Sequence, residues 1–436
     1  MNGIATGRPG RKQSKCGQRH GNQKHQPRRH KLTQDASPRG GPLAGLKVIE
    51  LATIVAAPSA ASYLSDYGAE VLKIELPDKG DGLRNFPPFK DEHSLWWKVV
   101  NRDKQLITLD LRKPRGREIF KSLLPHYDVL IENFRPGTLA RWGLDPDTLR
   151  QCRKDLIVLR ATAFGQDGPY RDRPGFARIF EAMGGLTYIS GEPQGAPMHA
   201  GYPIGDSIGA LFAALGVMVA LWRRTAHPQA PGEEIDLSMT EAMIKLLDFL
   251  PMQHDLLGKS QQRSGNVSQY AAPTGVYRTR DGGWVSLSGS TDALFAANCR
   301  AIGREDLLAD PRYASNRARC KNSDEVNRLF EQWFLLHDQN EVVERFQKAH
   351  GTVAPVYSAE QVVNDPQVVA RKFLQSVEDE DFGSVRIPGV VPRFRNSPCR
   401  IAHAARSMGA DNETVYSRLL GISAAEQDIL RQQGII

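Results

Sequence analysis

The sequence predicts an α/β protein built around an open, doubly wound parallel sheet. Two observations predict this fold. From residue 46 onward, short runs rich in Val, Ile and Leu alternate with helical patterns, as in βαβ units. The chain has 436 residues, of which 40% are hydrophobic and 24% charged. This length and composition suit a Rossmann-like large domain together with a smaller α+β domain.

The first predicted βαβ unit lies between residues 46 and 76. The runs LKVIEL (46–51) and AEVLKIEL (69–76) predict buried parallel strands. Between them, APSAASYLSDYG predicts a helix with Pro58 in its first turn and Gly68 at its end. The loop ATIVAAP lacks the G-x-G-x-x-G fingerprint. A nicotinamide-dependent dehydrogenase, which the α/β alternation alone would allow, is therefore not favoured.

The alternation continues along the chain. Further strands are predicted at 105–111, 127–134, 156–165 and 234–237, with helices between them.

The second half of the chain differs in composition. A polar segment at 258–269 predicts a linker, GVYRTRDGGWVSLSG predicts a hairpin, and helical patterns follow from Thr291 to His350. We expect a large-domain part at 41–257, a linker and small domain at 258–375, and a part at 376–436 that returns to the large domain.

The charge of the chain is concentrated at its beginning. Residues 1–40 hold ten Lys or Arg and one acid, so the rest sums to −1 although the whole chain carries +8. We predict a disordered basic tail at 1–40, either a polyanion-binding arm, a transit peptide or a start-site extension. The near-neutral body does not indicate nucleic-acid binding.

The cysteines and the absence of an apolar leader bear on the compartment. Five cysteines are far apart and form no CxxC pair: Cys16, Cys152, Cys299, Cys320 and Cys399. This pattern is typical of a reducing compartment and argues against a zinc site or a disulfide framework. We expect a cytoplasmic protein with no metal and no membrane association.

A single carboxylate precedes a long apolar run in GYPIGDSIGALFAALGVMVALWRR (201–224). Asp206 could be a helix N-cap, since Asp oxygens accept from the free N–H groups of a first turn. Alternatively, the helix N-terminus could keep this carboxylate ionised as a nucleophile. The run from Ile208 to Trp222 is shorter than a membrane span and predicts a helix buried on all sides.

Several motifs together resemble one family. They are PLAGLKVIEL, GAEVLKIE, GDGLR, LDLRKPRGREIFKSLLPHYDVLIENFRPGTLARWGL and GYPIGDSIGALFAALGVMVAL. From Pro42 to the C-terminus, and most densely up to Leu247, the chain resembles the class III CoA-transferases of the formyl-CoA transferase and carnitine CoA-transferase type. The resemblance implies an enzyme that transfers CoA between carboxylic acids. Its substrates would be acyl-CoA and a small carboxylic acid, with no tightly bound cofactor.

The resemblance also implies an interlocked homodimer. Each large domain would be built from both ends of its chain, and the active site would lie between the large domain of one chain and the small domain of the other.

The resemblance implies roles for individual residues. Asp206 falls on the nucleophile that forms an aspartyl anhydride and then an aspartyl-CoA thioester. The positions that match CoA contacts are Thr53, Ile54, Val55, Ala56, Leu109, Arg112, Asn133, Phe134, Arg141 and Trp142. Arg141 could instead be a solvated helix charge, and Asn133 could cap a helix that starts near Pro136.

The chain departs from the family pattern at some of these positions. Thr53 and Val55 stand where formyl-CoA members have His and Gln, Arg112 stands where Lys is common, and Leu76 replaces a basic contact.

Two further groups of residues are candidates for the acyl site. The stretch Ser264–Asn266 is the nearest candidate for a glycine loop that closes over the acyl group. Arg178, His199 and Tyr202 lie near Asp206 in the sequence and could bind the second carboxylate of a dicarboxylic acid.

Two alternative functions remain open. The α-methylacyl-CoA racemases resemble the same pattern but use a His–Asp pair, where this chain has Phe176 and Ala177. Without that His, one of the two bases for proton exchange is missing. A non-catalytic CoA-binding protein would retain the CoA loop and use Asp206 only as a cap.

Overall fold

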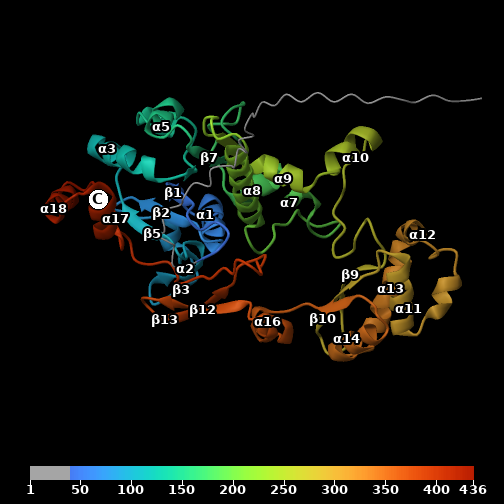
Figure 1. Cartoon of the computed structure of the whole chain (residues 1–436). Coiled ribbons are helices and arrows are strands. Elements are labelled where there is room, and N and C mark those ends of the chain that lie inside the picture. Colours follow the sequence, from blue (N-terminus) through green and yellow to red (C-terminus); the bar gives the residue numbers. More distant parts are fainter. Residues whose placement is uncertain (1–39) are drawn as a thin grey trace, which may run out of the picture. The chain divides into compact units, whose positions relative to one another are not determined.

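Six parallel strands form the main sheet, in the order β5-β2-β1-β6-β7-β8 (Figure 1). The computed structural model describes residues 40–436, so the tail predicted for 1–40 lies outside this range except for its last residue. The strands are β1 (Lys47–Glu50), β2 (Glu70–Glu75), β5 (Gln105–Thr108), β6 (Val129–Glu132), β7 (Ile157–Thr162) and β8 (Glu234–Ser238). The α/β fold with a parallel sheet is confirmed.

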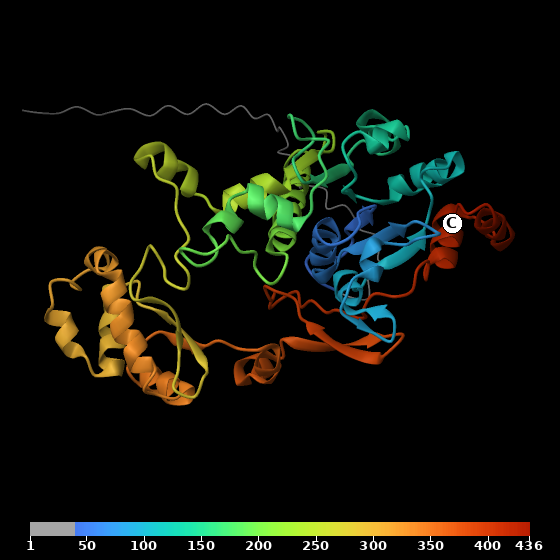
Figure 2. The same cartoon turned by 180° about the vertical axis from the view of Figure 1, so that it is seen from behind.

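Successive residues of each strand point to opposite faces of the sheet, and each face has its own apolar core. Ile49 and Leu72 belong to one core, and Val48 and Val71 belong to the other. Both faces are therefore covered by helices, as Figures 1 and 2 show. One face is covered by α3 (Pro114–Leu123), α5 (Pro146–Cys152), α17 (Asn412–Leu420) and α18 (Ala424–Gln432), and the other by α1 (Ala56–Asp66) and α8 (Ile204–Ala226).

Residues from the end of the chain complete the first core. Val415, Tyr416 and Leu430 pack with residues of β1, β2 and β6. The edge strand β5 is covered by the start of α17, where Asp411 accepts from the Leu106 N–H at 2.7 Å and Asn412 accepts from the Thr108 N–H at 2.9 Å. These contacts support the predicted return of the chain end to the first sheet, which stays a prediction.

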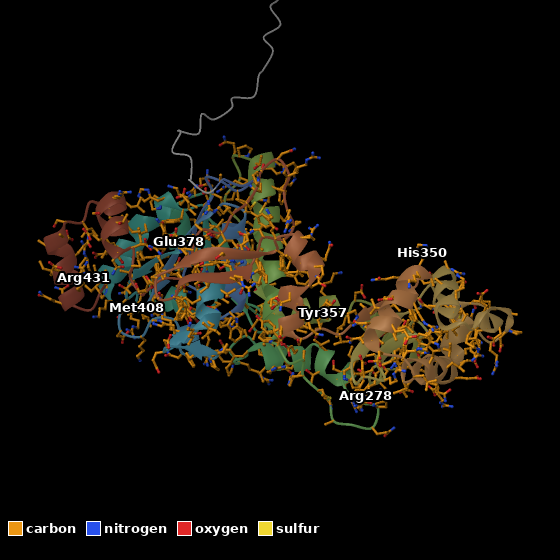
Figure 3. The ribbon with its side chains drawn as sticks, turned by 90° about the horizontal axis from the view of Figure 1, so that it is seen from below. Arg278, His350, Tyr357, Glu378, Met408 and Arg431 are labelled. Atoms are coloured by element: carbon orange, nitrogen blue, oxygen red, sulfur yellow. The ribbon has the colours of Figure 1, made fainter. Side chains whose placement is uncertain are left out.

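A separate apolar core is built from residues 272–346 alone. It packs between an antiparallel sheet, in the order β11-β10-β9, and four helices. Their bounds are β9 (Thr274–Arg278), β10 (Trp284–Ser288), β11 (Val353–Pro355), α11 (Asp292–Ile302), α12 (Asn316–Lys321), α13 (Ser323–Phe334) and α14 (Gln339–Lys348). The predicted hairpin is confirmed as the β9–β10 pair. Figure 3 labels Arg278 and His350 in this group of elements.

The separate core supports the predicted division at 41–257, 258–375 and 376–436, which stays a prediction. The remaining strands form two hairpins, β3 (Phe89–Lys90) with β4 (His93–Ser94) and β12 (Leu374–Asp379) with β13 (Gly383–Pro388). The remaining helices are α2 (Leu95–Val100), α4 (Thr138–Arg141), α6 (Ala177–Met183), α7 (Leu186–Ile189), α9 (Met239–Leu246), α10 (Leu250–Leu257), α15 (Ala359–Asn364), α16 (Pro366–Ala370), and the 3-10 turns η1 (Gly82–Asn85), η2 (Leu124–His126) and η3 (Glu305–Ala309).

Helix α8 differs from its prediction in length and in burial. It begins at Ile204 and ends at Ala226, so its 23 residues are long and apolar enough to cross a membrane by length and composition alone. The helix is therefore longer than the run from Ile208 to Trp222 on which the prediction was based. The prediction of burial on all sides is wrong. Its small residues pack on α1, whereas one stripe is exposed to solvent: Leu211 (58% exposed), Leu215 (57%), Val219 (60%) and Trp222 (73%).

Candidate active site

The order of the strands reverses between β1 and β6. The chain leaves β1 toward β2 on one side, whereas β6 is followed by β7 on the other side. Open α/β sheets bind ligands at this switch point, beyond the carboxyl ends of the strands. The loop after β1 carries Thr53, and the loop after β6 carries Asn133. These two predicted site residues are therefore brought together by the topology.

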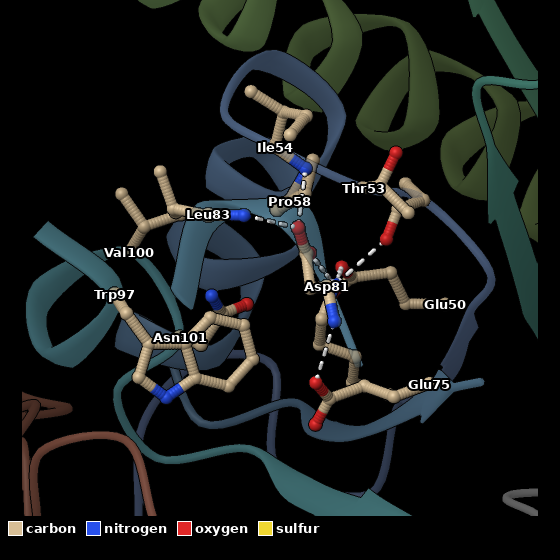
Figure 4. A network of polar contacts seen from close by, with 12 residues as sticks. Glu50, Thr53, Ile54, Pro58, Glu75, Asp81, Leu83, Trp97, Val100 and Asn101 are labelled. Atoms are coloured by element: carbon tan, nitrogen blue, oxygen red, sulfur yellow. Dashed lines mark hydrogen bonds and ion pairs between the residues drawn. The ribbon is translucent and has the colours of Figure 1, made fainter. Parts of the chain in front are cut away.

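The loop after β1 is held in an unusual conformation. Ile54 has a φ of 70°, which a β-branched residue rarely adopts. Its N–H donates to Oδ1 of Asp81 at 2.9 Å, and the N–H of Leu83 donates to the same oxygen at 2.9 Å (Figure 4). The Asp81 carboxylate thus fixes the backbone of this loop by accepting hydrogen bonds from two N–H groups.

A buried network of charges in turn holds Asp81 (Figure 4). Nζ of Lys73 lies 2.8 Å from Oδ2 of Asp81 and 2.7 Å from Oε1 of Glu50. Glu50 also accepts from Nζ of Lys104 at 2.6 Å. All four side chains are almost fully buried, so their mutual pairing offsets the cost of removing each charge from water.

The pKa values in the network reflect this pairing. Burial opposes the charge of Lys73, but the Asp81, Glu50 and Glu75 carboxylates raise its pKa above the usual value. Burial also opposes ionisation of Asp81, but Lys73 and the N–H donors of Leu83 and Ile54 lower its pKa. Burial lowers the pKa of Lys104 to about 8.

A cavity of about 250 Å³ opens beyond the carboxyl ends of β1, β6 and β7, and we call it the Asp206 cavity. It contains the predicted nucleophile and six of the ten predicted CoA residues, all from the segments that follow β1 and β6. Its lining residues are Thr53, Ile54, Val55, Ala56, Ala57, Asn133, Phe134, Arg135, Pro136, Ala161, Thr162, Ala163, Arg171, Arg173, Pro174, Gly175, Phe176, Phe180, Asp206 and Met239.

Asp206 is the third residue of α8, and Pro203 occupies the N-cap position. No side-chain hydrogen bond to Asp206 is formed within residues 40–436, so the capping interpretation is wrong. Asp206 lines the cavity, and within residues 40–436 its carboxyl group has no hydrogen-bond or ion-pair partner. Burial, and to a smaller extent the Glu181 carboxylate, raise its pKa to about 7. The expectation that the helix N-terminus keeps Asp206 ionised stays a prediction, and burial acts against it by favouring the protonated form.

Glu181 is a buried carboxylate near the partly buried Asp206, and no sequence pattern indicated it. It lies on α6 and its Oε1 accepts from the Gly205 N–H at 2.9 Å. Its Oε2 lies 3.3 Å from Nδ1 of His199 and 3.5 Å from a guanidinium nitrogen of Arg178. The Glu181 carboxylate therefore contacts the backbone of α8 at Gly205, the residue before Asp206.

A second cavity, of about 100 Å³, adjoins the first, and we call it the Trp142 cavity. It shares Thr53 and Phe134 with the Asp206 cavity, and it contains the predicted CoA residues Leu109, Arg112 and Trp142. Phe134 and Trp142 pack edge to face with their ring centroids 5.4 Å apart. Arg112 is paired with Asp110 through two contacts of 2.8 and 2.9 Å.

Other candidate residues lie outside both cavities. Arg141 is exposed and donates to Thr138 Oγ1 at 2.9 Å. Asn133 does line the Asp206 cavity, but it does not cap the next helix, because α4 begins at Thr138 after Gly137. The stretch Ser264–Asn266 does not line the Asp206 cavity, and its Gly265 N–H donates to Gly191.

The three residues predicted to bind a second carboxylate have other contacts. Arg178 donates to the Ala200 carbonyl at 2.7 Å, His199 faces Glu181, and Tyr202 packs on Trp96. The cations that do line the Asp206 cavity are Arg135, Arg171 and Arg173.

The fold and the paired cavities define an α/β protein with a candidate ligand site at its topological switch point. Residues 43–412 match the family model of CoA-transferase family III, and the chain belongs to this family. The protein is a CoA-transferase.

Three known proteins illustrate the similarity. The chain is 36% identical to a succinyl-CoA–D-citramalate CoA-transferase of Chloroflexus aurantiacus, over 91% of this chain and 98% of the relative. It is 34% identical to a succinate–glutarate CoA-transferase of Agrobacterium fabrum, over 88% and 97%. A solved CAIB/BAIF family protein from Brucella suis is 28% identical and superposes with a TM-score of 0.76, over 87% of this chain and 100% of that one.

Proposed function

We propose that the protein transfers CoA between carboxylic acids through covalent intermediates on Asp206. A carboxylate oxygen of Asp206 attacks the thioester carbon of an acyl-CoA, and the carbon–sulfur bond breaks. The products are a mixed anhydride and CoA thiolate. The thiolate then attacks the Asp206 carbonyl carbon and displaces the donor acid. The resulting Asp206–CoA thioester is attacked by the acceptor carboxylate, and the same steps in reverse release the new acyl-CoA.

The observation that carries this proposal is the position of Asp206. It is the one carboxylate among the described residues that line the Asp206 cavity, and it has no internal partner to compete with a substrate. With its pKa at about 7, a substantial fraction is ionised at neutral pH. The buried apolar side chains of Phe180 and Met239 also line the cavity, and limit the access of water that would hydrolyse an anhydride.

We assign CoA to the two joined cavities. The thioester lies at Asp206, and the pantetheine arm passes Thr53 and Phe134 toward Leu109, Arg112 and Trp142. The backbone of residues 53–56 and the side chain of Asn133 border this path. Arg141 stays a predicted contact of the nucleotide end.

Trapping tests the covalent mechanism. Incubation with succinyl-CoA and then borohydride reduces an Asp206 thioester to an alcohol, whereas hydroxylamine converts it to a hydroxamate. Peptide mass spectrometry of the wild type is expected to find the modification at Asp206. The Asp206→Asn variant is the matched control, and it is expected to remain folded, unmodified and inactive. An Asp206→Ala variant that retains most of the activity contradicts the mechanism.

We propose that the donor and acceptor acids are small dicarboxylic acids. The two relatives above are named for citramalate, succinate and glutarate, all of them dicarboxylic acids. A cavity that holds several guanidinium groups together with Asp206 is consistent with such substrates.

We further propose a homodimer. The exposed apolar stripe of α8, formed by Leu211, Leu215, Val219 and Trp222, is larger than isolated surface residues explain and supports burial against a second copy.

An α-methylacyl-CoA racemase is the second candidate in the same fold. At the positions of its His–Asp pair, Phe176 lines the Asp206 cavity and Ala177 is buried. Rapid deuterium exchange at the α-carbon of an acyl-CoA without CoA transfer would favour the racemase instead.

A further inference from the structure

Two of the arginines in the Asp206 cavity have no role in the steps described so far. Arg171 and Arg173 lie on the loop between β7 and α6, and both line the Asp206 cavity without lining the Trp142 cavity. Asp206 is the only carboxylate that this cavity offers within residues 40–436. The cavity wall therefore carries more positive than negative charge.

Aromatic packing holds the Arg173 guanidinium in place. Its central carbon lies 3.7 Å from the centroid of the Tyr170 ring, and Tyr170 packs edge to face on Phe164 at 5.9 Å. Stacking occupies the face of a guanidinium and leaves the N–H donors at its edge available. Within residues 40–436, the Arg173 side chain forms no hydrogen bond or ion pair that would occupy them.

Arg171 is also available to a ligand. Its nearest carboxylate is that of the next residue, Asp172, at 3.7 Å from Nε. Both side chains of this pair are largely exposed, and such pairs contribute little because water screens them. A ligand carboxylate inside the cavity can therefore compete for Arg171.

The position of these arginines relates them to the acyl group and not to the CoA phosphates. In CoA the thioester and the phosphates lie at opposite ends of the pantetheine arm. With the thioester carbon at Asp206, the nucleotide end extends past Thr53 and Phe134 into the Trp142 cavity. Arg135 also lines only the Asp206 cavity, but it follows Phe134, which lines both cavities, so we leave it on the CoA side. Arg171 and Arg173 remain beside the acyl group.

We propose that Arg171 and Arg173 bind the distal carboxylate of a dicarboxylic acyl group and so determine which acids the enzyme accepts. This inference rests on the proposed function, since it takes Asp206 as the site of acyl attack. The guanidinium fork matches a carboxylate in two-point geometry. Phe176 and Phe180 provide apolar surface for the methylene groups between the two carboxyl ends. A monocarboxylic acyl group leaves both cations without a counter-charge.

The first half-reaction tests this inference without knowledge of the acceptor acid. Succinyl-CoA and butyryl-CoA carry four-carbon acyl groups that differ at the distal end, and each is mixed with excess enzyme in a single turnover. Formation of the Asp206–CoA adduct is followed by mass spectrometry. We expect Arg171→Gln and Arg173→Gln to slow adduct formation from succinyl-CoA by about 10- to 100-fold each, the effect of losing a charge-assisted hydrogen bond.

The same variants are expected to react with butyryl-CoA at the wild-type rate within a factor of about three. Arg173→Lys retains the charge without the fork and should lie between Arg173→Gln and the wild type for succinyl-CoA. The matched control is Arg115→Gln, since Arg115 is an exposed arginine on α3 that pairs with Glu118 and Glu426 outside both cavities. It should leave both rates unchanged.

The outcomes separate this inference from the proposed function. A wild type that forms the adduct equally well from both thioesters, or variants that slow both equally, overturns the role of the arginines and leaves the Asp206 mechanism intact. A wild type that forms no adduct from any acyl-CoA overturns both.

Discussion

Two hydrogen bonds join Thr53 to Asn133 across the switch point of the sheet. The Thr53 N–H donates to Oδ1 of Asn133 at 3.0 Å, and Nδ2 of Asn133 donates to the Thr53 carbonyl oxygen at 2.9 Å. The amide side chain thus replaces a strand partner where the β1 and β6 loops diverge. It couples the two loops that line the Asp206 cavity.

Asn133→Ala removes both hydrogen bonds and frees the loop after β1. We expect the KM for acyl-CoA to rise about 5- to 30-fold, equivalent to about 1 to 2 kcal/mol of binding energy, with a smaller change in kcat. Asn133→Asp should behave similarly, because a carboxylate oxygen then faces the Thr53 carbonyl. The control is Asn364→Ala, which removes a bond within α15. An unchanged KM in both Asn133 variants would show that the loop does not need this link.

The raised pKa of Asp206 predicts the pH dependence of the reaction. Only the ionised carboxylate is a nucleophile, so kcat/KM should rise about tenfold per pH unit up to about pH 7 and level off above it. Glu181→Gln should move this profile to lower pH, because it removes a negative charge near Asp206. The profile should stay above the range of an ordinary Asp, because burial is the larger cause. A profile that is flat across pH 7 would contradict the assignment.

The same raised pKa predicts that the folded protein loses stability over the pH range in which its activity rises. An unfolded Asp titrates near 3.8, whereas folded Asp206 titrates at about 7, so the folded state favours the protonated form. Stability is therefore lost as the pH rises from about 4 to about 7. Asp206→Asn cannot ionise, so its melting temperature should exceed that of the wild type by a margin that grows over this interval. Equal melting temperatures of Asp206→Asn and the wild type at both pH 5 and pH 8 would be inconsistent with an Asp206 whose pKa is raised by folding.

Asp81 links the buried charge network to the loop after β1. Asp81→Asn keeps an oxygen for the Ile54 and Leu83 N–H groups but leaves Lys73 with less negative charge. We expect the free energy of unfolding to fall by about 3 kcal/mol, as for other broken buried pairs, and the KM for acyl-CoA to rise. Urea unfolding and steady-state kinetics measure the two effects. The exposed Asp147→Asn is the control and should change stability by less than about 0.5 kcal/mol.

The exposed apolar stripe of α8 predicts that charged substitutions on it will lower the molecular mass of the protein in solution. Leu215→Glu and Val219→Glu place charges on this stripe and should convert a dimer of about twice 48.4 kDa into single chains. Light scattering after gel filtration measures the mass, and Gln432→Glu on α18 is the control. A wild type that already has the mass of one chain would refute the dimer.

Local patterns were sufficient to predict much of the sheet. The runs at 46–51 and 69–76 contain β1 and β2, and the helix between them is α1. Strand β8 ends one residue beyond its prediction, at Ser238. These elements are specified by short-range periodicity, which a single sequence carries. The start of α8 was missed because the polar residues before Ile208 interrupt its apolar pattern.

The environment of the site was harder to predict. Glu50 and Lys73 were included in apolar strands, although the parallel register pairs them directly. That register could have indicated a buried ion pair. By contrast, the raised pKa of Asp206 depends on burial and on Glu181, 25 residues earlier, and neither follows from a local pattern. The cluster of arginines in YRDRPG was a visible signal, but its position in the cavity depends on the path of a loop.

The contacts of α17 with β5 have a consequence for synthesis in the cell. Asp411 and Asn412 cover the backbone of an edge strand that lies about 300 residues earlier in the chain. While a ribosome is still adding the intervening residues, that edge remains open to pairing with other nascent chains. Expression should therefore depend on chaperones or low temperature, and products that terminate before residue 411 should accumulate in the insoluble fraction.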